Sequence, residues 1–155
     1  MARRVLGVLR QYPWLVCELD DAVVGYAYAT AHRDRAAYRW SVDASAYISD
    51  RAHRQGIARG LYDRLFRILV TQGYRNVYAG ITLPNPASCE FHKAMGFREV
   101  GIYHQVGYKF DKWHDTVWLE RSLADHVADP PEPVALAVLL QSAGARAEIE
   151  SILSA

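Results

Sequence analysis

The chain of 155 residues is long enough for one domain with a substantial core, and 51% of its residues are hydrophobic. Its 18 basic and 17 acidic residues give a net charge of +1, which argues against a nucleic-acid-binding protein with a broad basic face. No apolar run reaches the length of a membrane span, and the first residues lack the features of a signal peptide. We therefore expect a cytoplasmic protein that binds neither nucleic acid nor membrane.

The first half of the chain is predicted to contain a helix end and three strands. Residues 1–10 have helical spacing of apolar side chains, and a Tyr-Pro pair then interrupts the helix. Trp14 to Leu19 and Val23 to Ala31 are predicted to form an antiparallel hairpin around a turn at Asp20-Asp21. A third strand is predicted from Tyr38 to Ser49.

A strongly amphipathic helix follows, with leucine or isoleucine at every fourth position from Ile57 to Leu69 and a terminating glycine at Gly73. The next predicted elements are a strand at 76–82, a helix from Asn85-Pro86 to Gly96, and strands at 97–106 and 116–123. Asn85 is a good N-cap and Pro86 a good first-turn residue. The pattern predicts a mixed sheet with helices on its faces.

A proline-rich segment separates this domain from the end of the chain. We expect a domain over residues 1–123, a linker at 124–133 that contains the sequence PPEP, and a helical tail at 134–155. Within the tail, 134–143 and 146–153 are short amphipathic helix candidates. We expect the tail, or a second subunit, to cover apolar surface of the domain.

Cys17 and Cys89 are the only cysteines of the chain. Two cysteines are too few for a disulfide scaffold, and their spacing is not that of metal ligands. We therefore expect reduced thiols and no metal site.

The join between the third strand and the long helix has the features of an anion site. The first N–H groups of a helix have no partner within the helix, and they carry the positive end of its dipole. Gly56 lets a ligand approach the backbone, and Arg54 and Arg59 add positive charge. The segment lacks the Lys-Ser of phosphate loops and the three glycines of dinucleotide sites. Locally, a pyrophosphate site and an ordinary helix start with solvated arginines are equal alternatives.

The sequence of this join resembles motif A of the GNAT acetyltransferases, Gln/Arg-x-x-Gly-x-Gly/Ala. Here it reads His53-Arg54-Gln55-Gly56-Ile57-Ala58, so that His53 replaces the usual first residue. Together with RAAYRWSVDASAYIS, LPNPASCEFHKAMGF and VGYKFDKWHD, it resembles the phosphinothricin/methionine sulfoximine N-acetyltransferase group over residues 12–123. That family normally has a strand and one or two helices before this region, so the resemblance implies an N-terminally short domain.

The resemblance implies a fold, a co-substrate and an acceptor. The fold would be an α/β (α+β) mixed, mostly antiparallel sheet with helices on both faces and a splayed central strand pair. Acetyl-CoA would be the co-substrate and a small amine the acceptor, and we also expect a homodimer. The cofactor-binding residues that the resemblance implies are Ala46, Tyr47, Ile48, Arg54, Gln55, Gly56, Ile57, Ala58, Arg59, Asn85 and Ser88. Helix capping is the alternative role for Asn85 and Ser88.

Two residues take catalytic positions in the resemblance. Asp43 stands where relatives commonly have Glu and would act as the base through a water molecule, provided that its environment raises its pKa from about 3.9. The alternative is a hydrogen-bonded strand carboxylate. His92 would protonate the leaving thiolate. Its alternative is a histidine packed on the helix face.

Arg33, Arg35 and Tyr38 precede Asp43 in a segment that borders the acceptor pocket in similar enzymes. An arginine there can pair bidentately with a carboxylate or phosphinate, which favours an acidic or zwitterionic amino-acid-like acceptor. The alternative is a solvated run of loop charges. Two other functions remain open: acetylation of another amine, such as a polyamine, an antibiotic or a protein N-terminus, and an inactive CoA-binding remnant.

Overall fold

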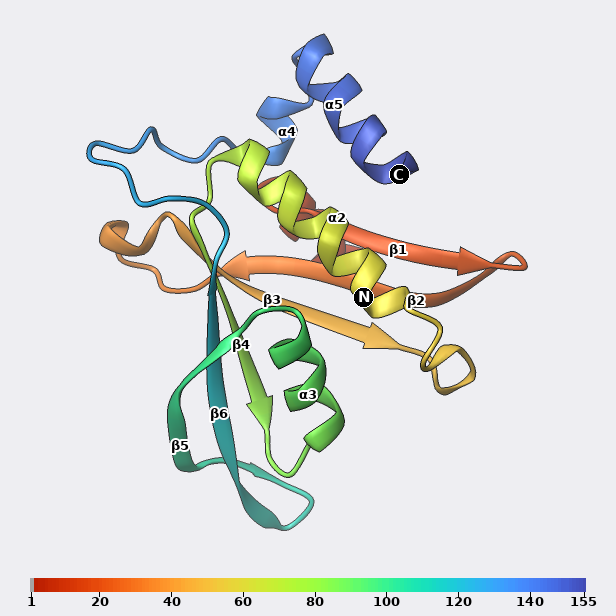
Figure 1. Cartoon of the computed structure of the whole chain (residues 1–155), viewed down its shortest axis with the longest axis vertical. Helices are drawn as coiled ribbons and strands as arrows, with labels where there is room; N and C mark the ends of the chain where they lie inside the picture. The colour runs from red at the N-terminus through yellow and green to blue at the C-terminus, as the bar shows by residue number, and fades with distance from the viewer. Residues whose placement is uncertain (1) are drawn as a thin grey trace.

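The computed structural model describes residues 2–155, and it describes side chains from residue 5 onward. Its strands form one six-stranded sheet in the order β1-β2-β3-β4-β6-β5 (Figure 1). The strands are β1 (Trp14–Leu19), β2 (Ala22–Ala31), β3 (Ser41–Ile48), β4 (Asn76–Thr82), β5 (Arg98–Lys109) and β6 (Lys112–Ser122).

Helices connect or follow the strands. They are α1 (Ala2–Leu9), α2 (Ile57–Gln72), α3 (Pro86–Ala94), α4 (Leu136–Leu139) and α5 (Ala143–Ser154), with 3-10 turns at Ala36–Tyr38 and Asp50–Ala52. No helix within residues 2–155 is both long enough and apolar enough to cross a membrane.

The central strands β3 and β4 form the one parallel pair of the described sheet, and they pair over a short length. Ser41, Val42 and Asp43 pair with Asn76, Val77 and Tyr78, and the strands diverge beyond them. By contrast, β3 stays paired with β2 as far as Ile48, and β4 stays paired with β6 as far as Thr82. Figure 1 shows the two halves of the sheet opening away from each other. The expected mixed, mostly antiparallel sheet with a splayed central pair is confirmed.

Helix α2 packs against one face of the sheet through its leucine stripe. Leu61, Leu65 and Leu69 are buried, and Val42 and Ala79 are among the strand residues that face them in the core. Each such leucine contributes roughly 1.5–3 kcal/mol relative to an exposed position. Because side chains alternate along a strand, the neighbours of these strand residues point to the opposite face.

The start of the third strand was predicted too early. β3 begins at Ser41 rather than at Tyr38, because residues 36–38 form a 3-10 turn. The Nε–H of Arg39 donates to the carbonyl of Ala36 at 2.8 Å and closes this turn. The apolar and aromatic composition of the segment, which suggested a strand, does not reveal such a local side-chain bond.

The last two strands were predicted too short. They continue to Lys109 and from Lys112, and they form one long hairpin. Phe110 and Asp111 make its turn with φ values of 53° and 56°. Two-residue hairpin turns need such positive φ values, and their usual signal is Asn-Gly or Asp-Gly. Without that signal, the sequence suggested a bent connection.

The linker and tail are held against α2. Gln72 is buried, and its Nε2 donates to the carbonyls of Gln11 and Val134 at 2.8 Å each. Ile149 and Ile152 of α5 pack with Ile68 of α2 in a second apolar cluster. The predicted helix at 134–143 is shorter than expected, and α5 begins earlier than expected because Ser142 caps it.

We expect Ile152→Ala to lower the free energy of unfolding by about 2–5 kcal/mol, because it opens a cavity between α5 and α2. Urea unfolding of the whole chain measures the change. Leu153→Ala, at the next residue, is the matched control, since the side chain of Leu153 is 45% exposed. Equal and small effects of both substitutions would contradict a structural role for the tail.

Candidate active site

A cavity of about 540 Å³ opens where β3 separates from β4. The C-terminal half of β3, the start of α2 and one side of α3 form its walls. The predicted cofactor residues in these walls are Ala46, Ile48, Arg54, Gly56, Ile57, Ala58, Arg59 and Ser88. The other lining residues are Ala52, His53, Ala87, Phe91 and His92. The cavity thus combines apolar walls with the N-terminus of a 16-residue helix.

The start of α2 offers unpaired backbone donors to this cavity. Gly56 is the N-cap with φ 77°, and no side chain caps the helix. Arg54 also has a positive φ, 62°, which turns the chain sharply before the helix. A Cβ at Gly56 would meet no heavy atom within 4 Å, so the space in front of the backbone is open. The backbone donors and the lining residues Arg54 and Arg59 fit a pyrophosphate, and the apolar walls fit a pantetheine chain.

Three predicted cofactor residues lie outside the cavity walls. Tyr47 points to the other face of the sheet, where it stacks on Tyr26 at 5.1 Å between ring centroids. Asn85 uses its Oδ1 to accept the N–H of Ser88 at 3.1 Å, which is the capping role. Gln55 lines a different groove, of about 580 Å³, between the outer strand β1 and α2.

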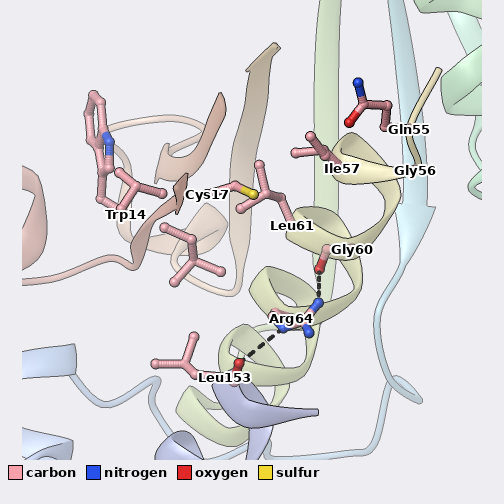
Figure 2. A pocket seen from close by; sticks show the side chains of 11 residues that line it. Trp14, Cys17, Gln55, Gly56, Ile57, Gly60, Leu61, Arg64 and Leu153 are labelled. Carbon is pink, nitrogen blue, oxygen red and sulfur yellow. Dashed lines mark hydrogen bonds between the residues drawn. The ribbon is translucent and has the colours of Figure 1, made fainter. Parts of the chain in front are cut away.

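Figure 2 shows this second groove. Within it, Arg64 of α2 donates to the carbonyls of Gly60 and Leu153, and the second of these bonds ties α2 to the end of α5 (Figure 2). The guanidinium is therefore held by one backbone oxygen of α2 and one of α5, and Arg64 does not line the cofactor cavity.

His92 is buried between α2 and α3. Its Nδ1–H donates to the carbonyl of Ser88 at 2.8 Å, which leaves Nε2 to accept the hydroxyl of Tyr62 at 3.1 Å. Burial lowers the pKa of His92, and the hydrogen bond to Ser88 offsets part of that effect. A neutral ring with both nitrogens occupied favours the packed alternative over the acid, although the ring does line the cavity.

Asp43 is the last residue of β3 that pairs with β4, and the two central strands separate beyond it. Its Oδ1 lies 2.6 Å from Nδ1 of His32, which immediately follows β2. Burial raises the pKa of the Asp43 carboxyl, and the hydrogen bond from His32 and the charge of Arg33 offset part of the rise. A raised pKa is the condition that the base hypothesis requires.

A small hollow of about 190 Å³ lies on this face of the sheet. His32 stacks on Tyr78 at 4.1 Å and meets Trp118 edge-on at 5.9 Å. These three residues and Arg33 line the hollow. No sequence motif indicates this grouping, because only the strand register places His32 beside Asp43.

The predicted acceptor residues divide between two places. Arg33 lines the hollow beside His32, and it also lines a second hollow of about 450 Å³ at the end of the sheet. Arg35 and Tyr38 line that second hollow together with Tyr12 and Tyr74. Of the predicted acceptor set, Arg33 is therefore the residue that lies beside Asp43 and its partner His32.

The chain matches the acetyltransferase (GNAT) domain family over residues 1–118. It is 39% identical over 124 residues to a phosphinothricin N-acetyltransferase of Streptomyces viridochromogenes, covering 80% of this chain and 67% of the relative. It is 34% identical to an L-methionine sulfoximine/L-methionine sulfone acetyltransferase of Salmonella typhimurium, covering 82% of this chain and 72% of the relative.

A solved structure is also similar. It is a GNAT superfamily phosphinothricin acetyltransferase from Sinorhizobium meliloti in complex with acetyl-CoA, with a TM-score of 0.76 and 34% identity. The match covers 88% of this chain and 74% of that chain.

We expect the protein to lose stability as the pH falls, partly because of the lowered pKa of His92. Since its pKa is lower in the folded state, the unfolded chain binds the proton more readily, and stability is lost as the pH falls below about 6.5. His92→Gln should therefore show a smaller loss of unfolding free energy between neutral and mildly acidic pH. Urea unfolding at each pH measures this, with the exposed His126→Gln as control. Identical pH dependence of wild type and His92→Gln would contradict the assignment.

Proposed function

The chain belongs to the GNAT family of acetyl-CoA-dependent N-acetyltransferases, and from this we propose that it acetylates the amine of a small amino-acid-like acceptor of the phosphinothricin or methionine sulfoximine type. The acceptor class is proposed from the names of the two relatives described above. The observation that carries the proposal is the cavity at the strand divergence, where the motif A helix start, the end of β3 and α3 meet.

The cavity residues suit the two ends of acetyl-CoA. Backbone N–H groups of the first turn of α2, with Arg54 and Arg59, would hold the pyrophosphate. The apolar side chains of Ala46 and Ile48 and the backbone of β3 beyond its last pair with β4 would hold the pantetheine. Backbone hydrogen bonds from this unpaired side of β3 would orient the thioester for attack.

The opposite face of the sheet carries the groups that an acceptor needs. Asp43, with its pKa raised by burial, lies at the point where the strands separate. A zwitterionic acceptor would place its amine near this carboxylate and its anionic group at Arg33. The amine must lose a proton before its nitrogen attacks the thioester carbon. The resemblance implies His92 as the proton donor to the thiolate, but its two occupied nitrogens favour a packing role on the cavity side.

A panel of amines tests the proposal. The whole chain is incubated with acetyl-CoA and, separately, with phosphinothricin, methionine sulfoximine, methionine sulfone and spermidine, while release of free thiol is followed. We expect turnover with the first three amines and little with spermidine. Turnover with spermidine alone would support the other-amine alternative, and tight CoA binding with no turnover would support the inactive remnant.

We expect Arg33→Gln to raise KM for the amino-acid-like acceptor about tenfold, because a bidentate ion pair is lost. KM for acetyl-CoA should not change, since Arg33 lies outside the cofactor cavity. Arg35→Gln is the matched comparison. Of the hollows described above, Arg35 lines the one at the end of the sheet and not the one beside His32. A larger rise from Arg35→Gln would move the anionic group of the acceptor to that hollow.

A further inference from the structure

We propose that His32 is a catalytic residue of this site: with Asp43 it forms a coupled base that takes the proton of the acceptor ammonium group. The inference rests on the proposed function and adds a residue that neither the motifs nor the expected acceptor set contained. It is carried by the short Asp43–His32 contact and by the hollow that His32 lines.

The hydrogen bond between His32 and Asp43 has a defined direction. An ionised carboxylate can only accept, so the Nδ1 of His32 carries the hydrogen and donates to Oδ1 of Asp43 at 2.6 Å. In the neutral ring, Nε2 is then the basic nitrogen. The carboxylate fixes this tautomer and stabilises the positive charge that forms when Nε2 takes a proton.

Two aromatic neighbours hold the ring of His32 in place. Its face stacks on Tyr78, and its edge meets Trp118, so the imidazole has little freedom to rotate away from Asp43. The side chain of His32 is 12% exposed and that of Asp43 is 28% exposed. His32 is therefore shielded from bulk water but lines the hollow directly, whereas Asp43 is not among the residues that line it.

The register of the sheet determines the face on which the hollow lies. Asp43 pairs with Tyr78, and Trp118 pairs with Gly80, two residues further along β4. These residues share one face of the sheet, opposite to α2, because side chains alternate. The hollow thus lies on this face next to the point where the central strands separate, and an acceptor there would face the thioester through the opening.

The walls of the hollow suit a small zwitterion. The guanidinium of Arg33 lies 5.9 Å from the ring centroid of Trp118, and both residues line the hollow. The indole Nε1 of Trp118 is buried without a hydrogen-bond partner among the described residues. An ammonium group near His32 and an anionic group near Arg33 would match this distribution of charge.

Nε2 of His32 takes a proton from the acceptor ammonium, and the resulting imidazolium is paired with the Asp43 carboxylate. The free amine forms a bond to the acetyl carbon as the carbon–sulfur bond breaks. The second proton on nitrogen leaves with the thiolate as the thiol of CoA, and the imidazolium returns its proton to water. The products are the N-acetylated acceptor, CoA and one proton.

Two variants separate the base from its support. His32→Asn keeps an amide N–H close to the place of Nδ1, so it can still donate to Asp43, but it has no basic nitrogen. His32→Ala leaves a space that added imidazole can enter. Both are assayed with acetyl-CoA and the best amine of the panel, and CoA binding and urea unfolding are measured on the same preparations. His126→Asn, at an exposed histidine, is the matched control.

We expect His32→Asn to lower kcat by about 100-fold or more with unchanged KM for acetyl-CoA, since a general base contributes roughly 10²–10⁴ to rate. Added imidazole should restore part of the activity of His32→Ala and should not help Asp43→Asn. The double variant of His32 and Asp43 should lose little more than either single variant, because the two act as a unit.

Three results would overturn the inference. An active wild type with fully active His32→Asn and His32→Ala would remove His32 from the reaction and leave the proposed function standing. Loss of activity together with weaker CoA binding, or loss that imidazole does not relieve, would show that His32 is structural. Absence of turnover by the wild type with every amine would instead remove the proposed function, and the catalytic role of His32 with it.

Discussion

The short pairing between β3 and β4 determines where the sheet opens and which elements meet there. Within the described sheet, β3 pairs with β2 at seven positions and β4 with β6 at seven, but β3 and β4 pair at three. Each half of the sheet is therefore held firmly by its own antiparallel ladder, and the join is short. A backbone left unpaired inside a sheet must find other partners, so an opening of this kind suits a ligand that brings hydrogen-bonding groups.

The divergence also separates the chemistry onto two faces. The period of two along β3 points Val42 and Ala44 toward α2 and Asp43 away from it. The crossover from β3 to β4 then brings the N-terminus of α2 to the same end of the sheet as the opening. One face consequently offers backbone donors and apolar walls, and the other offers a carboxylate, an imidazole and an arginine. This arrangement suits a reaction between two substrates that approach the opening from opposite faces of the sheet.

The sequence predicted the elements whose signals are local. The leucine period and Gly73 determined α2 to within a residue, and Asn85-Pro86 determined the start of α3. The turn at Phe110 was missed because its residues carry no turn signal. His32 was missed for a different reason: its partner is eleven residues away, and only the register of β2 against β3 brings the two side chains together.

Two histidines near the opening show how environment assigns a role that residue type cannot. His92 has its Nδ1–H on a carbonyl and its Nε2 on the Tyr62 hydroxyl, and burial opposes its charged form. His32 has a carboxylate on Nδ1, and its ring borders a hollow. The sequence motifs predicted a catalytic role for His92, because it lies four residues before Gly96. The geometry gives the stronger argument for proton transfer to His32, because the carboxylate of Asp43 orients its ring and the ring lines the hollow.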